Sequence, residues 1–355
     1  MITPVAAANP AALAPYDDII DVRSPAEFAE DHVPGAINLW VLDNDQRAEV
    51  GAIYVQQSRF LARRIGAAHV ARNIARHLDE RLTDKPGSWS PLVYCWRGGQ
   101  RSNAMATVLE QVGWRVGLLQ GGYKTYRRRV TAALYDAEPD VTVILLDGYT
   151  GVAKTEVLGR LAARGIQTLD LEGLAAHRGS LFGALPGAPQ PHQKGFESAL
   201  LHALERLDRR RPIVVEAESS KVGALNLPPM LWKAMIAAPR IELLAPPPAR
   251  ALYLTEAYGD IVADPAALDD TLARLPIHHG KARLEEWREM AGRGEFVALA
   301  AGLIEHHYDP AYLRSRHKET RPCLAEIVLD DLDGPSLDAA ADTIAALLNT
   351  RESRP

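Results

Sequence analysis

Cys95 lies in a loop whose composition favours the reactive thiolate form of a cysteine. The loop, CWRGGQRS at 95–102, follows a short apolar run at 92–94 and leads into an amphipathic helix. Backbone N–H groups in such a loop can turn toward the sulfur, and the helix start adds partial positive charge. With Arg97 and Arg101 nearby, we expect a readily ionised, nucleophilic thiol. The alternative is a buried structural cysteine, but a core position does not call for two glycines and two arginines.

A second motif follows the apolar strand predicted at 141–146. The segment DGYTGVAKT at 147–155 places a glycine-containing loop and a Lys-Thr pair before a helix, which is the order of a phosphate-binding P-loop. Backbone N–H groups at the helix start would hold phosphates, with Lys154 as a point charge and Thr155 available to a metal ion. Glycine is usual where this chain has Ala153, and alanine at a positive φ costs about 1 kcal/mol. An ordinary strand-to-helix turn is the alternative.

Charged residues near the predicted strand ends could assist phosphate chemistry. Glu216 and Glu218 end a strand at 212–215, where they either hold a metal-bound water or form a solvated strand end. Arg250, on a helix after the next strand, could contact phosphate oxygens bidentately. The run Arg209–Arg211 either is a solvated surface or contacts RNA phosphates.

The remaining candidate ligands do not predict a metal site. The pairs His278-His279 and His306-His307 are adjacent residues that cannot easily face one ion, and no cysteine or acidic partner lies at ligand spacing. We expect structural or surface roles for them. Cys323 has no glycine loop around it and is expected to be inert.

The totals are typical of a soluble globular protein. A length of 355 residues suggests about two domains, and 47% hydrophobic with 24% charged residues is usual for that class. No apolar run approaches the roughly 18–20 residues that span a bilayer, and the N-terminus lacks a secretory signal. Only two cysteines are present, which predicts a reducing, cytoplasmic setting. A net charge of −5 leaves any nucleic-acid binding to local basic patches.

The elements around Cys95 alternate between strands and helices. Residues 1–15 are rich in Ala and Pro and are expected to form a loose arm, followed by a parallel-sheet α/β domain over 16–135. A capping box begins a helix at Ser24. Cys95 then lies at the carboxyl end of a strand, where sites form in parallel sheets. Strands are predicted at 18–22, 92–94 and 116–119, a turn followed by a strand within 32–39, and a long helix at 59–82.

A second domain is expected over 140–350. A basic run at 124–129 and a less regular segment ending at Pro139 mark the boundary. Beyond the helix of Arg250 the chain is predicted to be mostly helical up to Asn349. The fold class is therefore α/β, with a parallel-sheet domain followed by a P-loop NTPase-like α/β domain that has a helical C-terminal part.

The cysteine loop resembles the active-site loop of rhodaneses, which carry sulfur or selenium on a cysteine. A rhodanese-like domain followed by a P-loop domain is similar to the bacterial tRNA 2-selenouridine synthases. The resemblance covers about residues 16–320, and the two motifs together are specific where either alone is weak. Further matching segments are DVRSPAEF (21–28), HVPGAIN (32–38), HRGS (177–180), PQP (189–191), FE (196–197), VEAES (215–219) and YDP (308–310).

The resemblance implies replacement of sulfur by selenium at C2 of the wobble 2-thiouridine of tRNA, with selenophosphate as donor. It also implies S-geranylation of that thiouridine from geranyl diphosphate, after which selenium displaces the alkylated sulfur. Alkylated sulfur is a better leaving group than thiocarbonyl sulfur, and the diphosphate needs a phosphate-binding loop. No cofactor is firmly implied, and Mg²⁺ is compatible with the loop. The implied partners are tRNA, through its single-stranded anticodon loop, and selenophosphate with its synthetase, without a membrane.

The resemblance also assigns roles to residues. Cys95 becomes the covalent selenium carrier, as an S-selanylcysteine intermediate, and Arg97 and Arg101 orient selenophosphate and stabilise the thiolate. Trp96 either stacks on the target base or packs beneath the loop, and His177 with Arg178 would contact the leaving pyrophosphate. The substrate-binding candidates are Trp96, Gly98, Gly99, Gln100 and Ser102, and the phosphate-binding candidates are Gly148, Thr150, Gly151, Lys154, Thr155, His177 and Arg178.

Three residues depart from the usual pattern of that family. Ala153 replaces a glycine, Trp40 a proline and His192 a serine. Ala153 argues against nucleotide binding more than against diphosphate binding. Two alternative functions stay open, a sulfurtransferase fused to an NTP-dependent kinase-like domain and a non-catalytic tRNA-binding module.

Overall fold

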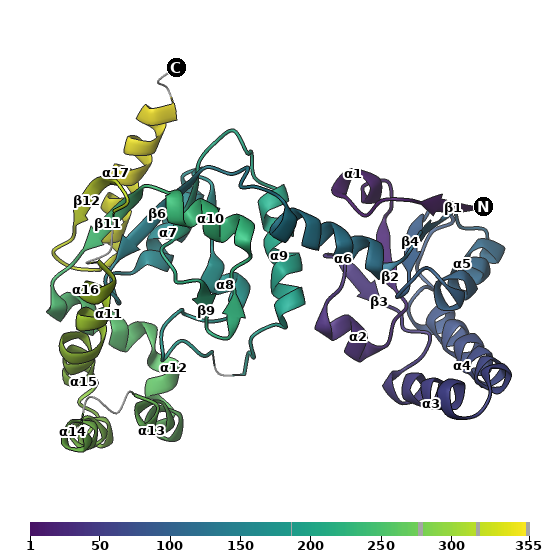
Figure 1. Ribbon diagram of the computed structural model, residues 1–355, viewed down its shortest axis with the longest axis horizontal. Helices are drawn as coiled ribbons and strands as arrows, with labels where there is room; N and C mark the ends of the chain where they lie inside the picture. The colour runs from purple at the N-terminus through teal and green to yellow at the C-terminus, as the bar shows by residue number, and fades with distance from the viewer. Residues whose placement is uncertain (186, 276–279, 317–319, 353–355) are drawn as a thin grey trace. The chain divides into compact units, whose positions relative to one another are not determined.

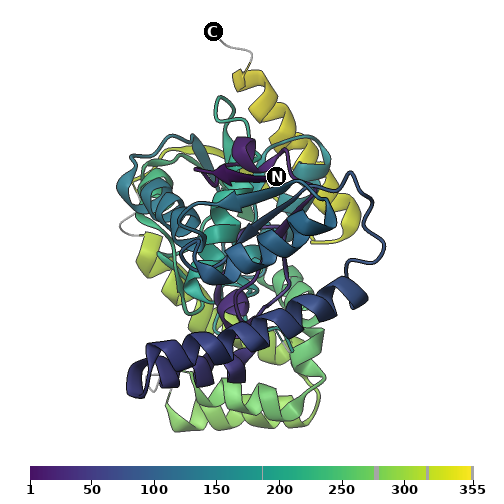
Figure 2. The ribbon, with the colours of Figure 1, turned by 90° about the vertical axis from the view of Figure 1, so that its right-hand side faces the viewer.

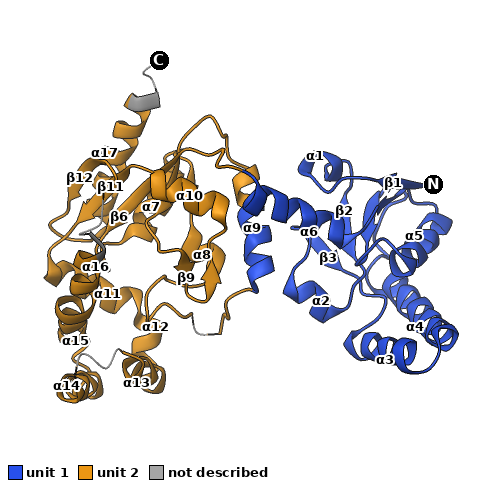
Figure 3. Ribbon diagram, viewed as in Figure 1, with its two compact units in different colours: residues 1–137, 192–202 blue, residues 138–191, 203–355 orange. Residues whose placement is uncertain are grey.

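The computed structural model describes residues 1–185, 187–275, 280–316 and 320–352. The chain divides into two compact units, shown in separate colours in Figure 3. Unit 1 comprises Met1–Ala137 and His192–His202, and unit 2 comprises Glu138–Pro191 and Ala203–Pro355. The first boundary falls in the segment expected to separate the domains. The return of 192–202 to unit 1 was not predicted.

Unit 1 is built on a five-stranded parallel sheet with the order β1-β5-β4-β2-β3. Helices α4 and α5 cover one face and α2 and α6 the other (Figure 1), and Figure 2 looks onto the side of α4 and α5. Its elements are β1 (Ile2–Val5), α1 (Pro10–Leu13), β2 (Asp18–Asp21), α2 (Pro25–Glu30), β3 (Ala36–Asn38), α3 (Asn44–Gln56), α4 (Arg59–Glu80), β4 (Pro91–Tyr94), α5 (Gln100–Val112), β5 (Val116–Leu119), α6 (Tyr123–Thr131), the π-helix η1 (Ala132–Asp136) and most of α9 (Gln193–Glu205).

The N-terminal residues form an edge strand and a short helix, so the expectation of a loose arm was wrong. Strand β1 pairs in parallel with β5, and Val5 and Ala8 are buried. A run of four residues is too short to show the alternation of a strand, and Pro4 argues against a central one. An edge strand tolerates proline because only one of its sides is hydrogen-bonded within the sheet.

Helix α9 explains why residues 192–202 belong to unit 1. The buried carboxylate of Glu197 accepts hydrogen bonds from the guanidinium of Arg127 and, at 2.5 Å, from the Tyr135 hydroxyl. At the same helix Lys194 Nζ lies 2.6 Å from Glu30 Oε1. A buried carboxylate with a cationic partner holds α9 against this unit, because breaking the pair would leave a charge without compensation.

Unit 2 contains a second five-stranded parallel sheet, with the order β12-β11-β6-β8-β7. The sheet packs against α7 and α17 around Leu146, Val157 and Ile344. Its elements are β6 (Val143–Gly148), α7 (Lys154–Ala163), β7 (Thr168–Leu169), α8 (Leu171–Ala175), β8 (Ile213–Glu216), β9 (Lys221–Val222), β10 (Leu225–Asn226), α10 (Pro229–Ala237), β11 (Arg240–Leu244), α11 (Pro247–Ala257), α12 (Gly259–Val262), α13 (Pro265–Ala273), α14 (Lys281–Gly292), α15 (Phe296–Leu303), the π-helix η3 (Ile304–Tyr308), α16 (Asp309–Arg316), β12 (Cys323–Val328) and α17 (Gly334–Glu352).

The helices α11 to α16 form the expected helical part and have a core of their own around Trp287. The stretch up to Asn349 is mostly helical as predicted, but Cys323–Val328 forms the edge strand β12, which was not predicted. None of its residues is fully buried, so the sequence carries a weak strand pattern. Within the described residues no helix combines the length and the apolar character needed to cross a membrane.

Candidate active site

The Cys95 loop connects β4 to α5, and a glycine turn after β5 supports it from below. The backbone N–H of Tyr123 donates to Cys95 O at 2.8 Å. Gly122 has a φ of 58°, and a Cβ at this position would lie 2.1 Å from Cys95 O. Only glycine therefore allows this approach. The sequence showed Gly121-Gly122 as a turn but not its contact with the cysteine loop, which depends on the pairing of β4 with β5.

The sulfur of Cys95 is buried but surrounded by hydrogen-bond donors. Its Sγ accepts from the Gly99 N–H and the Ser102 hydroxyl, both at 3.2 Å. Burial opposes ionisation, but hydrogen bonds from Ser102 and from the loop amides, including that of Arg97, outweigh it and lower the pKa of the thiol. The sequence offered a buried structural cysteine and a readily ionised cysteine as alternatives for Cys95. In the structure this residue is buried and its thiol also has a lowered pKa.

The arginines of the loop do not play the part expected in stabilising the thiolate. Arg97 is exposed. Arg101 donates to Glu27 Oε2 at 2.8 Å, and Glu27 is the capping-box residue that also accepts the Ser24 N–H. Burial opposes the ionisation of Glu27, but its contacts with Arg101 lower its pKa. Hydrogen bonds to the sulfur, rather than the arginine charges, therefore hold the Cys95 thiolate.

Trp96 packs within unit 1. Its ring stacks on Tyr123 with centroids 5.2 Å apart, and the guanidinium of the buried Arg23 lies 4.0 Å from the centroid of Tyr123. Of the two roles considered, packing is the one the structure shows, although Trp96 remains partly exposed. Gly98 has a φ of 65° and contacts the glycine turn, while Gln100 begins α5 beside Arg101.

A groove of about 550 Å³ lies beside the cysteine loop, between α3, α4 and α5. Gln100 and Arg101 line its end, and most of its wall is apolar. It is large enough for a small organic group.

The P-loop of unit 2 has the backbone of a phosphate-binding loop. Ala153 adopts a φ of 57° and a ψ of 34°, the left-handed conformation that the missing glycine would favour. Gly151 has a φ of 84°, and a Cβ on it would lie 2.8 Å from Leu254 Cγ on α11. The strain expected at Ala153 is therefore present, and the loop keeps its shape despite the substitution.

The side chains of the P-loop are held by local partners. Lys154 Nζ donates to the carbonyl oxygens of Gly148 and Tyr149 at 3.0 and 3.2 Å. Arg250 was expected near phosphate, but it is 2% exposed and binds Asp309 at 2.6 Å and Thr150 O at 3.0 Å. The Arg250 side chain therefore anchors the P-loop backbone at Thr150. The sequence could not show this because Asp309 lies far along the chain.

A cleft of about 580 Å³ opens at this loop. Among the predicted residues it is lined by Gly148, Thr150, Gly151, Lys154, Thr155 and Arg178. Arg178 pairs with Asp260 at 3.0 Å, and its buried NH1 has no hydrogen-bond partner among the described residues, so it can take an anionic oxygen. His177 does not line the cleft, and its Nδ1 accepts the Gly179 N–H at 3.1 Å.

Glu172 and Glu218 line the same cleft, and the buried Glu216 interacts electrostatically with both. Burial and repulsion by Glu172 raise the pKa of Glu216 to about 8 and that of Glu218 to about 7. Glu216 is 1% exposed, so it is not a solvated strand end, and its Oε1 has no partner among the described residues. Thr155 donates to Glu172 Oε2 at 2.9 Å. Glu172 was missed by the sequence reading, because only the fold brings it beside the P-loop.

The other candidates lie outside these sites. His278 and His279 lie outside the described residues. His306 has Glu305 at 3.8 Å, and His307 packs edge-on against Tyr308. In the arginine run, Arg209 pairs with Asp140 and Arg210 with Asp208, which favours the solvated-surface interpretation.

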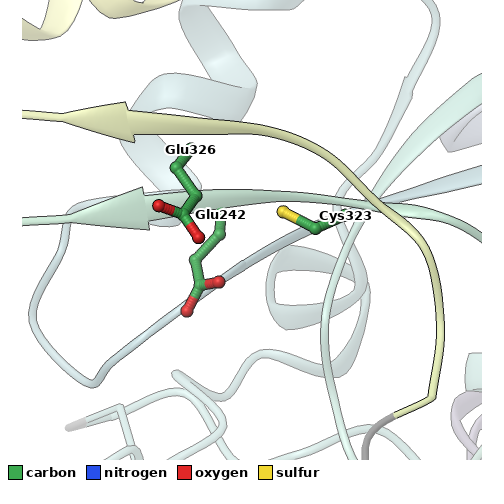
Figure 4. Close-up of side chains that lie close together, drawn as sticks. All are labelled: Glu242, Cys323 and Glu326. Carbon is green, nitrogen blue, oxygen red and sulfur yellow. The ribbon is translucent and has the colours of Figure 1, made fainter.

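One group in the described part of the chain has metal-ligand atoms close together. Glu242, Cys323 and Glu326 lie on adjoining strands β11 and β12 with their ligand atoms within 4.8 Å of one another (Figure 4). Arg240 also pairs with Glu242. Glu242 is buried and already paired with the buried Arg240, whereas Cys323 and Glu326 are exposed, and we assign no site to the group. That Cys323 is inert stays a prediction.

Each of the two units contains a segment that matches a known protein family. Residues 5–129 match the rhodanese-like domain, and residues 141–275 match the tRNA 2-selenouridine synthase AAA domain. The tRNA 2-selenouridine synthase of Aeromonas salmonicida is 34% identical over 330 residues, covering 84% of this chain and 87% of that protein. The chain belongs to the tRNA 2-selenouridine synthase family. These matches confirm the family predicted from the two motifs and the predicted fold class. The members of this family are transferases.

Two further relatives bear the same name. That of Salmonella schwarzengrund is 36% identical over 327 residues, covering 83% of this chain and 88% of the relative. That of Cupriavidus pinatubonensis is 35% identical over 235 residues, covering 64% of this chain and 62% of the relative.

Proposed function

We propose that this chain is a tRNA 2-selenouridine synthase that replaces the sulfur at C2 of the wobble 2-thiouridine by selenium, with selenophosphate as donor and an S-geranyl intermediate. The observation that carries the proposal is the Cys95 thiol, buried in a rhodanese-like loop yet with a lowered pKa. Such a thiol is a nucleophile prepared to bind a chalcogen atom. Its occurrence in one chain with a cleft at a phosphate-binding loop supports a reaction in two stages.

In the first stage, the thiouridine sulfur attacks C1 of geranyl diphosphate. The new C–S bond forms as the C–O bond breaks, pyrophosphate leaves with the electron pair, and N3 of the base releases its proton. The P-loop amides, Lys154 and Arg178 would bind the diphosphate and stabilise the charge of the leaving group. Glu218 lines the same cleft, and with a pKa of about 7 it can accept the proton near neutrality.

The residues of the cleft also fit a divalent cation. Thr155 and Glu172 offer the hard oxygen ligands that Mg²⁺ prefers. When bound, Mg²⁺ would neutralise charge on the diphosphate.

In the second stage, Cys95 carries selenium as an S–Se group. Water attacks the phosphorus of selenophosphate, so that the P–Se bond breaks and phosphate and selenide form. Selenide and the Cys95 thiolate then form the Sγ–Se bond, and the two electrons released reduce a small disulfide to two thiols. A thiol returns these electrons when selenium leaves as selenide. Selenide then attacks C2 of the base, and geranylthiolate leaves. Arg97, whose side chain is exposed, would orient the incoming anion.

The experiment is mass analysis of nucleosides from thiolated tRNA incubated with the protein, selenophosphate, geranyl diphosphate and a thiol–disulfide buffer. Each substrate is omitted in turn. We expect S-geranyl-thiouridine without selenophosphate and selenouridine with both substrates. Cys95→Ser should abolish selenium transfer and retain tRNA binding, whereas the control Cys323→Ser should retain both.

The alternative functions predict different results. ATP turnover without selenium incorporation would support the kinase-like alternative. Full activity in Cys95→Ser, or tRNA binding without any modification, would refute the catalytic proposal.

A further inference from the structure

A small apolar cavity lies inside the helical part of unit 2. It has a volume of about 70 Å³, is partly open to solvent, and is bounded by helices α11, α12, α13 and α15 with the π-helix η3. Leucine, isoleucine and phenylalanine side chains, among them Phe182, Leu268 and Phe296, make most of its wall. The only polar side chains of the lining carry hydroxyl groups. Such a cavity binds hydrocarbon rather than charged groups.

The cavity adjoins the P-loop cleft. Leu254, Tyr258 and Tyr308 line both spaces, so these three residues, which we call the neck, lie between them. The loop also packs directly on the neck, because Leu254 leaves no room for a Cβ on Gly151. A ligand whose phosphates occupy the loop therefore has the apolar cavity within reach of its other end.

The neck separates a polar side from an apolar side. Tyr258 Oη lies 2.9 Å from Ser180 Oγ, and the guanidinium of Arg178 stands 4.8 Å from the centroid of the Tyr258 ring. Arg178 and Ser180 face the cleft, whereas Phe182, two residues further along the chain, lines the cavity. This gradient suits a molecule with an anionic head and a hydrocarbon tail.

We propose that the cavity binds the tail of an allylic diphosphate and limits its length to ten carbons. This inference rests on the proposed function and adds the place where the chain is held. At roughly 10–15 Å³ for each water-sized group, the cavity takes about five to seven such groups. One isoprene unit then fills the cavity, the unit next to the diphosphate lies at the neck, and a third unit would extend beyond the apolar wall toward solvent.

The test compares two small-to-large variants on α15. Ala300 lines the cavity, whereas Ala298 on the same helix is exposed. We expect Ala300→Phe to raise the KM for geranyl diphosphate about 30-fold, because the ring displaces two or three buried methylene groups. Ala298→Phe should have the wild-type KM. Inhibition by inorganic pyrophosphate, which needs only the loop, should be equal in both.

A second variant enlarges the cavity. Phe296→Ala should improve the use of farnesyl diphosphate relative to geranyl diphosphate about tenfold, as judged by the ratio of kcat/KM values. Circular dichroism and thermal unfolding would identify any variant that fails to fold, and the opposite changes in volume guard against a general loss of activity. All variants should convert tRNA that already carries S-geranyl-thiouridine to selenouridine at the wild-type rate.

The failures are distinguishable. If the wild-type chain transfers no prenyl group from any diphosphate, the proposed geranylation fails and the cavity inference fails with it. If the wild-type chain geranylates tRNA but folded Ala300→Phe keeps its KM and Phe296→Ala keeps the preference for geranyl, only the cavity inference is overturned.

Discussion

Replacing Ser102 by alanine tests what stabilises the Cys95 thiolate. The Ser102 hydroxyl is fully buried and lies 3.2 Å from Sγ. A hydrogen bond to a charged group contributes about 1.5–3 kcal/mol. Its loss should therefore lower the acid ionisation constant of the thiol about tenfold to hundredfold. The amide of Gly99 remains in place, so the pKa of Cys95 should rise without the loop losing its shape.

The assay is the pH dependence of alkylation by iodoacetamide, read by mass spectrometry. A Cys323→Ser background removes the exposed second thiol, so Cys95 is then the one cysteine of the chain. We expect the pH profile of Ser102→Ala to move to higher pH. Ser102→Thr, which keeps a hydroxyl, is the matched control and should stay close to the parent. An unchanged profile in folded Ser102→Ala would refute the argument.

The pH dependence of the free energy of unfolding should also reflect the ionisation of Cys95. The folded-state pKa of Cys95 is lowered, so the thiolate adds to the free energy of unfolding above the ordinary thiol pKa of about 8.5. This contribution is lost as the pH falls through the lowered folded-state value. Ser102→Ala should therefore destabilise the protein more at alkaline pH than at pH 5, as measured by urea unfolding.

Three further predictions concern the supports of the two sites. Gly122→Ala should lower the free energy of unfolding by about 2–4 kcal/mol, since its Cβ would clash with Cys95 O; unchanged thermal unfolding would contradict this. The raised pKa of the Glu216 carboxyl makes the free energy of unfolding of the wild type fall between pH 5 and pH 8. Over that range the free energy of unfolding of Glu216→Gln should therefore rise by at least about 2 kcal/mol relative to the wild type. An equal difference between the two proteins at both pH values in urea unfolding would exclude this. Arg250→Ala should cost about 3 kcal/mol by leaving Asp309 unpaired and should weaken pyrophosphate binding in calorimetry; undiminished binding would show that Thr150 O needs no anchor.

The local chemistry of both motifs could be predicted from the sequence because each is contained in about ten consecutive residues. The cysteine loop and the P-loop each follow a strand and precede a helix, as expected. Even the strained conformation of Ala153 follows from its place in the P-loop pattern. The fold then adds what sequence spacing cannot show, since Glu172 reaches Thr155 and Arg250 reaches Asp309 only through tertiary contacts.

The misjudged elements share a physical cause. Strand β1 and strand β12 are both edges of their sheets, where burial is incomplete and the apolar pattern is weak. The loop amides predicted to turn toward Cys95 do so, but Arg101, expected to assist them, finds a carboxylate partner in Glu27 from a different element. A sequence shows which residues are charged, but the partners that neutralise those charges are known only from the fold.

The placement of residues 192–202 has a practical consequence for dissecting the protein. The chain leaves unit 1 after Ala137, returns to it at His192 and leaves it again after His202, so no single cut yields both units whole. A fragment ending near residue 137 would lack the carboxylate of Glu197, exposing Arg127 and Tyr135 that bind it. Complementing that fragment with a synthetic peptide of the missing helix would be the way to obtain the thiol-bearing half by itself.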